Sequence, residues 1–160
     1  NIERYCMHIS DFYYQALDLA YLLFNNNSIH FLNHHKIQQY SYFPSHFFNY
    51  KCLLRDHHIA GKDVCVEGDA VLSVYGIRDC VSDFGFLYPD SAEFKQFSSL
   101  YNRTSSWGVL GISSPEIIYN PKHFFYYRGY KFASLETVRK FKLFQGTKAD
   151  LEDVFLMNNL

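Results

Sequence analysis

Apolar positions recur with a helical period at the two ends of this chain. Between residues 11 and 24 they fall every three or four positions, which predicts an amphipathic helix ended by three asparagines. A second helix is expected at 47–57. Near the C-terminus, a third helix is expected, with Ser134 as its N-cap and Gly146 at its C-terminal end.

The last helix is expected to start at Thr147, which forms a capping box with Asp150. Its predicted buried face consists of Leu151, Val154 and Phe155. Because both C-terminal segments have caps as well as periodicity, they predict a pair of consecutive helices.

The middle of the chain has shorter apolar runs, which are typical of strands. Residues 64–67 and 80–88 are predicted strands, with a short helix at 70–75 between them, and 124–132 is a predicted hairpin or strand pair around Arg128-Gly129. The remaining expectations are a short strand or buried turn at 29–32, a loop at 34–45, a helix at about 91–102, and strands at 109–112 and 116–119.

These elements predict an α+β fold with a small mixed β-sheet, helices before it and two helices after it. The length of 160 residues suits a single domain over 1–160, with a helical N-terminal region at 1–60 and a core at 61–160. The sequence begins at Asn1 rather than Met, so we expect it to be a fragment of a longer chain.

Charge and cysteine content narrow the possible partners and compartment. A net charge of -1 argues against a nucleic-acid-coating protein, and no apolar run reaches the length of a membrane span. The four cysteines form no C-x-x-C pair, which favours free thiols in a reducing compartment over a disulfide framework. We therefore expect a cytoplasmic protein.

Aromatic residues make up 19% of the chain, with 14 Tyr and 16 Phe. They are compatible with a Phe-rich core and with a surface on which sugar or base rings stack. A third interpretation is an interaction module that uses exposed rings, for which the candidates are Tyr40, Tyr42, Tyr126 and Tyr127.

The most informative stretch runs from Gly68 to Tyr88 and reads GDAVLSVYGIRDCVSDFGFLY. A glycine between a strand and a helix lets a phosphate approach backbone N–H groups. A carboxylate at the start of the neighbouring strand, here Asp83, can hold a divalent cation against that phosphate. This order of elements favours phosphoryl or nucleotidyl transfer.

This stretch resembles the nucleotidyltransferase superfamily, the DNA polymerase β-like fold. Gly68 and Asp83 match its turn glycine and the first Asp of its Asp-x-Asp strand. The residues from Tyr75 to Asp83 are similar to a branch found with surface-polysaccharide genes, which reads roughly Y-G-[IL]-R-[DE]-x-x-D-[IL]-D. Lys142 and the later K-A-D-L-E-D, residues 148–153, are similar to the Lys-bearing and K-D-x-x-D helices of such families.

The resemblance implies a magnesium-dependent nucleotidyl or phospho-sugar transferase, with a nucleotide or sugar phosphate as its small-molecule partner. It implies the following roles: Asp83, Asp69 and Arg78 in catalysis, Gly68 and Lys142 in binding the nucleotide, and Asp83, Asp69 and Glu116 as metal ligands. Glu116 is expected on a later strand.

Two departures from the family pattern lead to a second hypothesis. Gly85 replaces the second Asp of Asp-x-Asp, and Asp69 replaces the Ser of Gly-Ser. Because two-metal transfer needs about three clustered carboxylates, the alternative is a degenerate, non-catalytic domain that binds a nucleotide, a sugar or a protein. Structural roles also remain open: a turn glycine at Gly68, a surface ion pair at Arg78, a solvated Lys142.

Other enzyme classes lack their sequence signatures. Asp83-Phe84-Gly85 matches the DFG of kinases, but Ile77-Arg78-Asp79 lies too close before it and no G-x-G-x-x-G is present. Neither G-x-S-x-G nor G-x-x-x-x-G-K-[ST] occurs, which excludes the serine hydrolase and P-loop patterns.

Overall fold

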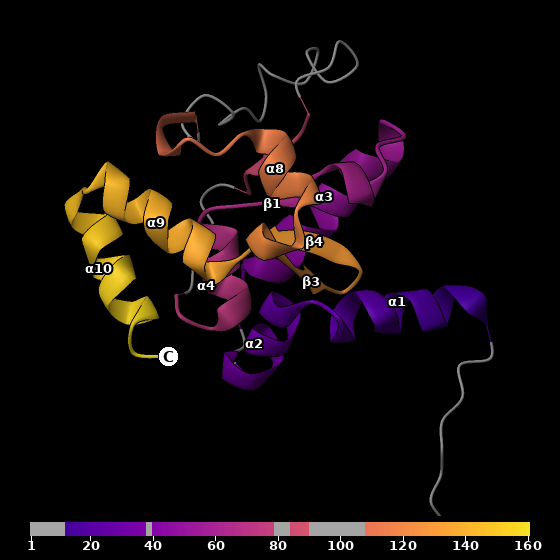
Figure 1. Ribbon diagram of the computed structural model, residues 1–160, viewed down its shortest axis with the longest axis horizontal. Coiled ribbons are helices and arrows are strands. Elements are labelled where there is room, and N and C mark those ends of the chain that lie inside the picture. Colours follow the sequence, from indigo (N-terminus) through magenta and orange to yellow (C-terminus); the bar gives the residue numbers. More distant parts are fainter. Residues whose placement is uncertain (1–11, 38–39, 79–83, 90–107) are drawn as a thin grey trace, which may run out of the picture.

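Four short strands form a mixed sheet at the centre of the computed structural model, which describes residues 12–37, 40–78, 84–89 and 108–160 (Figure 1). The strands are β1 (Cys65–Val66), β2 (Phe86–Leu87), β3 (Phe124–Tyr127) and β4 (Tyr130–Ala133), in the spatial order β2-β1-β4-β3. β1 runs antiparallel to β2 and parallel to β4. The predicted α+β class with a small mixed sheet is thus confirmed.

β3 and β4 form the hairpin predicted at 124–132. Its two turn residues, Arg128 and Gly129, both have positive φ, of 48° and 81°. Two central residues with positive φ match the twist of antiparallel strands. The hairpin therefore keeps a regular register, from the pair Phe124 and Ala133 to the pair Tyr127 and Tyr130.

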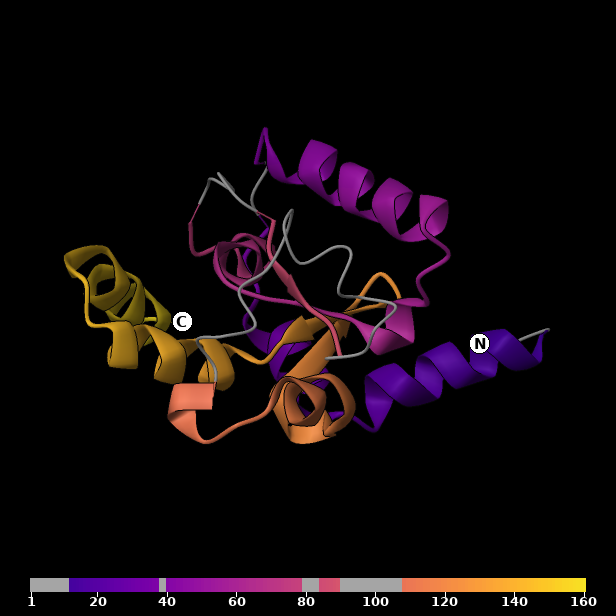
Figure 2. The same cartoon turned by 90° about the horizontal axis from the view of Figure 1, so that it is seen from above.

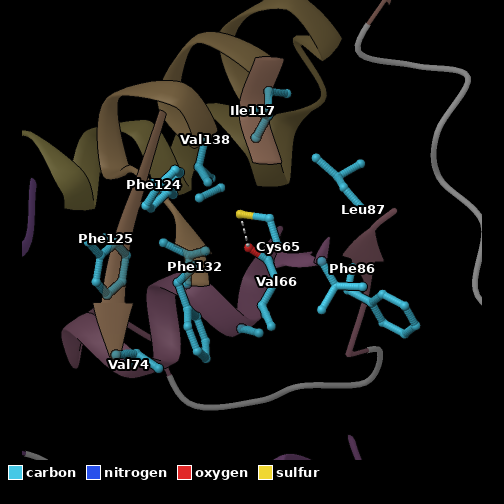
Figure 3. Close-up of a cluster of buried hydrophobic side chains, with 14 of the residues drawn as sticks. Cys65, Val66, Val74, Phe86, Leu87, Ile117, Phe124, Phe125, Phe132 and Val138 are labelled. Atoms are coloured by element: carbon cyan, nitrogen blue, oxygen red, sulfur yellow. Dashed lines mark hydrogen bonds between the residues drawn. The ribbon is translucent and has the colours of Figure 1, made fainter. Parts of the chain in front are cut away.

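Both faces of the sheet are buried, as Figure 3 shows for side chains that alternate along the strands. Val66, Phe86 and Phe132 share one face, where α3 (Phe43–Asp56) packs through Phe47, whose ring centroid lies 6.1 Å from that of Phe132. The other face carries Cys65 and Leu87. In Figure 2, α3 lies on one side of the sheet, and α8 (Ser114–Tyr119) and α9 (Leu135–Gln145) lie on the other.

The N-terminal region is helical, as predicted. α1 (Tyr13–Leu23) is followed by α2 (Asn26–His34), where we expected a short strand or a buried turn. Asn25 explains this helix, because its side chain accepts a hydrogen bond from the amide of Ser28 and so caps α2. The same side chain donates to the carbonyl of Phe124, which fixes α2 against β3.

Three further sequence predictions are wrong. Residues 116–119 belong to the helix α8, because Ser113 caps it and Pro115 fits its first turn. Residues 108–110 form a 3₁₀ turn, η2 (Gly108–Leu110), in place of a strand at 109–112, and α3 begins at Phe43, inside the predicted loop. The other 3₁₀ turns are η1 (Gly61–Asp63) and η3 (Pro121–His123). The helix expected at 91–102 lies outside the described residues.

The two C-terminal helices, α9 and α10 (Lys148–Met157), are confirmed with their caps. Ser134 and Thr147 accept hydrogen bonds from the amides of Thr137 and Asp150, and Gly146 ends α9 with a φ of 63°. The buried face predicted for α10 is wrong except for Val154. Leu151 and Phe155 are exposed, and the inward side carries Asp150, Asp153, Val154 and Met157.

Most of the aromatic residues in the described parts of the chain build the core rather than a surface. Of the four tyrosines proposed as an exposed interaction surface, Tyr42 is exposed, but Tyr40, Tyr126 and Tyr127 are partly buried against the core. Tyr127 packs its ring against Phe31 and Phe132. Within the described ranges, no helix is both long and apolar enough to cross a membrane.

Candidate functional site

A glycine-led turn joins the central strand β1 to the helix α4 (Asp69–Tyr75). Gly68 has φ 66° and ψ -141°, a conformation that side chains disfavour and glycine tolerates. Asp69 follows as the first residue of α4, where its charge is favourable at the positive end of the helix. The turn glycine and its helix therefore lie where the sequence predicted them.

The ammonium of Lys142 meets three carboxylates. Its Nζ lies 3.0 Å from Asp69 Oδ1, 3.3 Å from Asp150 Oδ1 and 2.7 Å from Asp153 Oδ2. Lys142 comes from the last turn of α9, Asp69 from α4, and the other two from α10. Side chains from three helices thus converge on one buried cation.

Arg78 extends this group to five charged side chains, which we call the Lys142 cluster: Asp69, Arg78, Lys142, Asp150 and Asp153. The Arg78 guanidinium donates to Asp153 Oδ1 at 2.7 Å, so Asp153 joins two cations. The Lys142 side chain is 8% exposed and that of Asp153 is 2% exposed, whereas the values for Asp69 and Arg78 are 36% and 41%. The cluster is closed at its α10 end and open to solvent at Asp69 and Arg78.

Hydrogen bonds hold the members of the cluster in position. The Ser73 hydroxyl donates to the backbone carbonyls of Asp69 and Arg78, both at 3.2 Å, and so links the start of α4 to the segment that follows the helix. The hydroxyl of Thr147 donates to Asp150. Because Ser73 holds the backbone at Asp69 and Arg78 and Thr147 holds the Asp150 carboxylate, the cluster is a preformed unit.

Electrostatics favour the charged form of Lys142. Burial alone lowers the pKa of its ammonium, but the hydrogen bond to Asp153 and the nearby charge of Asp69 raise it by more. The net result is a pKa above the ordinary value for lysine. Lys142 therefore carries its charge throughout the physiological range.

Several predicted site residues are brought together, and others are not. Asp69 and Lys142 are in direct contact, Gly68 adjoins Asp69, and Arg78 joins them through Asp153. Glu116 lies on α8 rather than on a strand. Its carboxylate lies 3.8 Å from His123, and within the described residues it makes no hydrogen bond or ion pair with the Lys142 cluster. Asp83, the central predicted ligand, lies outside the described residues.

Among the described residues, no group of three or more His, Cys, Asp or Glu side chains has the arrangement of a metal site. In the Lys142 cluster, the ammonium occupies the point between the carboxylates. Any divalent cation would therefore have to approach from the solvent side, at Asp69.

Sequence reasoning missed Glu67, the residue before the turn glycine. It is 2% exposed, and its amide donates to the carbonyl of Gly85 at 3.0 Å. A Cβ atom added to Gly85 would lie 3.3 Å from Glu67 Oε1. The absence of a side chain at Gly85 thus leaves room for the Glu67 carboxylate.

Asp150 and Asp153 belong to the K-A-D-L-E-D motif, but the sequence alone indicated no charged partner for them. Their spacing of three residues places both on one helical face. That face also carries Val154 and Met157, which are buried. Two carboxylates on the apolar side of a helix are a signal of a buried cationic partner.

Comparison with protein-family models, curated proteins and solved structures found no match to this chain. The nucleotidyltransferase resemblance therefore depends on the motif residues alone.

Proposed function

We propose that this chain is a nucleotidyltransferase-like protein that binds a nucleotide or sugar phosphate as its magnesium complex. The proposed activity is nucleotidyl or phospho-sugar transfer in surface-polysaccharide synthesis. The observation that supports it most is the contact of Asp69 with Lys142 at 3.0 Å, across 73 positions of sequence. Both residues belong to the two stretches of sequence that carry the family resemblance.

The charge of the Lys142 cluster favours a ligand that arrives with a cation. Three carboxylates face two cationic side chains, which leaves a formal surplus of one negative charge. A free phosphate would be repelled by this surplus, whereas the magnesium ion of a complex would be attracted to an exposed carboxylate and would offset part of that repulsion. Magnesium is commonly held by one or two carboxylates together with substrate phosphates and water.

The magnesium of this proposal would be held weakly, because the described residues contain no group of three or more His, Cys, Asp or Glu side chains arranged for a metal. Asp69 is the carboxylate of the cluster with the most exposed side chain, and Asp83 is the second ligand predicted from the sequence. When bound, magnesium supplies positive charge to the phosphates of the ligand. Lys142 holds Asp69 in place, and Gly68 leaves the backbone of the turn accessible to a phosphate.

Arg78 would contribute a direct contact to the ligand. Its guanidinium is anchored by Asp153, and the Arg78 side chain as a whole is 41% exposed. Arginine carries five N–H donors in a planar fork, which suits phosphate oxygens. An anchored guanidinium loses little side-chain entropy when it binds such an anion.

A magnesium and nucleotide titration tests this function. We expect nucleotides to raise the melting temperature only when magnesium is present, and Asp69→Asn to abolish the rise. The control is Asp56→Asn, which removes an exposed carboxylate at the end of α3. A ligand at 100 times its Kd would add about 2.7 kcal/mol of stability, so even a partial effect is measurable.

A second candidate, a non-catalytic binding domain, is favoured by two observations. Gly85 carries no carboxylate, and the ammonium of Lys142 is enclosed by three carboxylates rather than presented to a ligand. Turnover of labelled nucleotide by wild type, lost in Asp83→Asn, supports transfer. Magnesium-independent binding without turnover supports the second candidate, and absence of both binding and turnover contradicts the two functions together.

A further inference from the structure

A hollow with a cavity volume of about 1100 Å³ lies between α1 and the β3–β4 hairpin. Its walls also include η1 and the segment from α8 to η3. None of the Lys142 cluster lines it, and α1 and the α9–α10 pair lie at opposite ends of the molecule in Figures 1 and 2. The hollow is therefore separate from the proposed transfer site.

Lys131 lies in the lining of this hollow and is 6% exposed. Its ammonium donates to the backbone carbonyls of Lys62 and Ile118, both at 2.7 Å. It also lies 4.7 Å from the ring centre of Phe124 and 5.3 Å from that of Tyr119. Within the described parts of the chain, no carboxylate oxygen comes within 4.0 Å of it.

A buried ammonium without a carboxylate partner is costly, because its hydration is lost and only dipoles and rings replace it. Lys142 shows the usual arrangement in this molecule, with three carboxylates around one ammonium. Burial lowers the pKa of Lys131, and the charge of Asp63, which lies farther away than an ion-pair contact, raises it only in part. The ammonium of Lys131 has three N–H donors and uses two of them on the carbonyls of Lys62 and Ile118. The third N–H can donate a hydrogen bond to an anion.

The walls of the hollow supply flat apolar surface. Five rings line it, those of Tyr21, Phe24, Tyr119, Phe124 and Tyr126. Phe24 is 88% exposed, so its side chain is accessible to a ligand that enters along α1. Aromatic rings pack well against another planar ring, and their tyrosine hydroxyls offer polar contacts.

Charged side chains at the hollow favour an anion. Lys62 and Arg128 add two cations to Lys131, and the acidic residues in the lining are Asp18 and Asp63. Asp63 already accepts a hydrogen bond from the Tyr119 hydroxyl at 3.1 Å. The hollow thus combines a formal positive surplus with aromatic walls.

We propose that this hollow binds a small aromatic anion, one planar ring bearing a carboxylate or a phosphate. The anionic group contacts the ammonium of Lys131, and the ring packs against the tyrosine and phenylalanine side chains of the wall. Such a site is independent of magnesium and of the Lys142 cluster.

A matched pair of probes tests the proposal, namely benzoate and benzamide, which have the same ring with and without a charge. Titration of the ¹⁵N-labelled protein should shift the amide signals of Lys131 and Tyr126 with benzoate, and leave those of Lys142 unchanged. Benzamide should bind at least about tenfold more weakly, the size of one hydrogen bond to a charged group. Phenyl phosphate in place of benzoate identifies which anionic group is preferred.

Two variants examine the role of the cations. Lys131→Met should abolish the preference for benzoate. Arg128→Asn should weaken benzoate binding a few-fold, because it removes one of the cations at the hollow. Asn is chosen at this position because it tolerates the positive φ of the turn. Lys148→Met, at the start of α10, is the charge-matched control and should bind as wild type does. If Lys131→Met does not fold, Arg128→Asn decides the matter.

Equal binding of benzoate and benzamide would overturn the proposal, as would benzoate shifts confined to the Lys142 cluster. Absence of binding by benzoate and phenyl phosphate alike would do the same. None of these results depends on magnesium or on nucleotide turnover.

Discussion

The carboxylate of Asp153 lies 2.7 Å from the ammonium of Lys142, and both side chains are buried. Its second oxygen lies equally close to the guanidinium of Arg78, which follows α4 in the chain. One carboxylate thus ties α9 and α10 to the segment that leaves α4. Because the turn glycine Gly68 directly precedes α4, this ion pair also helps to fix the candidate site.

Replacement of Lys142 by Met is expected to destabilise the protein strongly. The substitution leaves Asp150 and Asp153 buried beside each other without the shared cation. Removing one partner of a buried ion pair costs about 3–5 kcal/mol. Urea unfolding measures this change, and Lys148→Met, which removes an exposed lysine of α10, serves as the control. Similar stabilities of the two variants would show that the Lys142 cluster contributes little to folding.

The contribution of Lys142 should disappear only at strongly alkaline pH. Although burial lowers the pKa of this ammonium, the hydrogen bond to Asp153 and the charge of Asp69 raise it above the ordinary value. A raised pKa stabilises the folded state fully below the unfolded-state value of about 10.4. That stability is lost as the pH rises through the folded-state pKa. Unfolding free energies of wild type and Lys142→Met should therefore differ by a constant amount near neutrality and converge above that range.

The elements predicted correctly are those whose local signals agree with one another. Ser134, Gly146 and Thr147 marked the limits of α9 and α10, because cap residues act within one turn of the chain. Arg128 and Gly129 marked the hairpin turn in the same way. The mixed sheet itself followed from the order of these segments.

The errors come from contacts that local sequence does not carry. The segment 116–119 has β-branched residues, yet the Ser113 cap and Pro115 make it a helix. Leu151 and Phe155 are exposed because Asp150 and Asp153 take the inward side of α10 to reach Lys142. The contact between Lys142 and Asp69, 73 positions apart, was not predicted: the family resemblance assigned each residue a role in the site, and periodicity indicated no partner for either.

Cys65 is expected to be unreactive in the native protein. It is fully buried in β1, and burial, the largest influence, raises the pKa of its thiol far above the ordinary value. Because the thiolate is the reactive form, alkylation requires unfolding. Mass spectrometry after iodoacetamide treatment should show modification of Cys52, which is partly exposed, before that of Cys65. Equal rates at the two cysteines under native conditions would contradict the burial of β1.

Gly76 should not tolerate a side chain. It ends α4 with a φ of 72°, and an added Cβ would lie 2.4 Å from the carbonyl oxygen of Lys36. Left-handed backbone costs a non-glycine residue about 1–2 kcal/mol, and the contact with Lys36 adds to this.

Two glycines separate these contributions. Gly111 has a similar φ of 70° but open space around its Cβ position, so Gly111→Ala reports the backbone cost alone. Gly108→Ala, with open space and no such φ, should be close to neutral. Thermal unfolding should rank the loss of stability as Gly76→Ala, then Gly111→Ala, then Gly108→Ala. If the first two were equal, the close approach of Lys36 would be disproved.

Restoring the second Asp of the Asp-x-Asp motif is expected to harm the protein as long as Glu67 is present. The Cβ of Gly85→Asp would lie 3.3 Å from Glu67 Oε1, so two carboxylates would share one buried space. Such a pair cannot ionise fully, and we expect a loss on the order of 2 kcal/mol at neutral pH. The loss should shrink on acidification, because protonation of one carboxyl removes the repulsion.

Glu67→Gln in the same chain as Gly85→Asp should recover most of the stability. The same Glu67→Gln change should not help Gly108→Asp, which is the control in open space. Urea unfolding of the single and double variants gives the coupling energy between positions 67 and 85; a value near zero would mean that the carboxylate of Glu67 does not occupy the space beside Gly85.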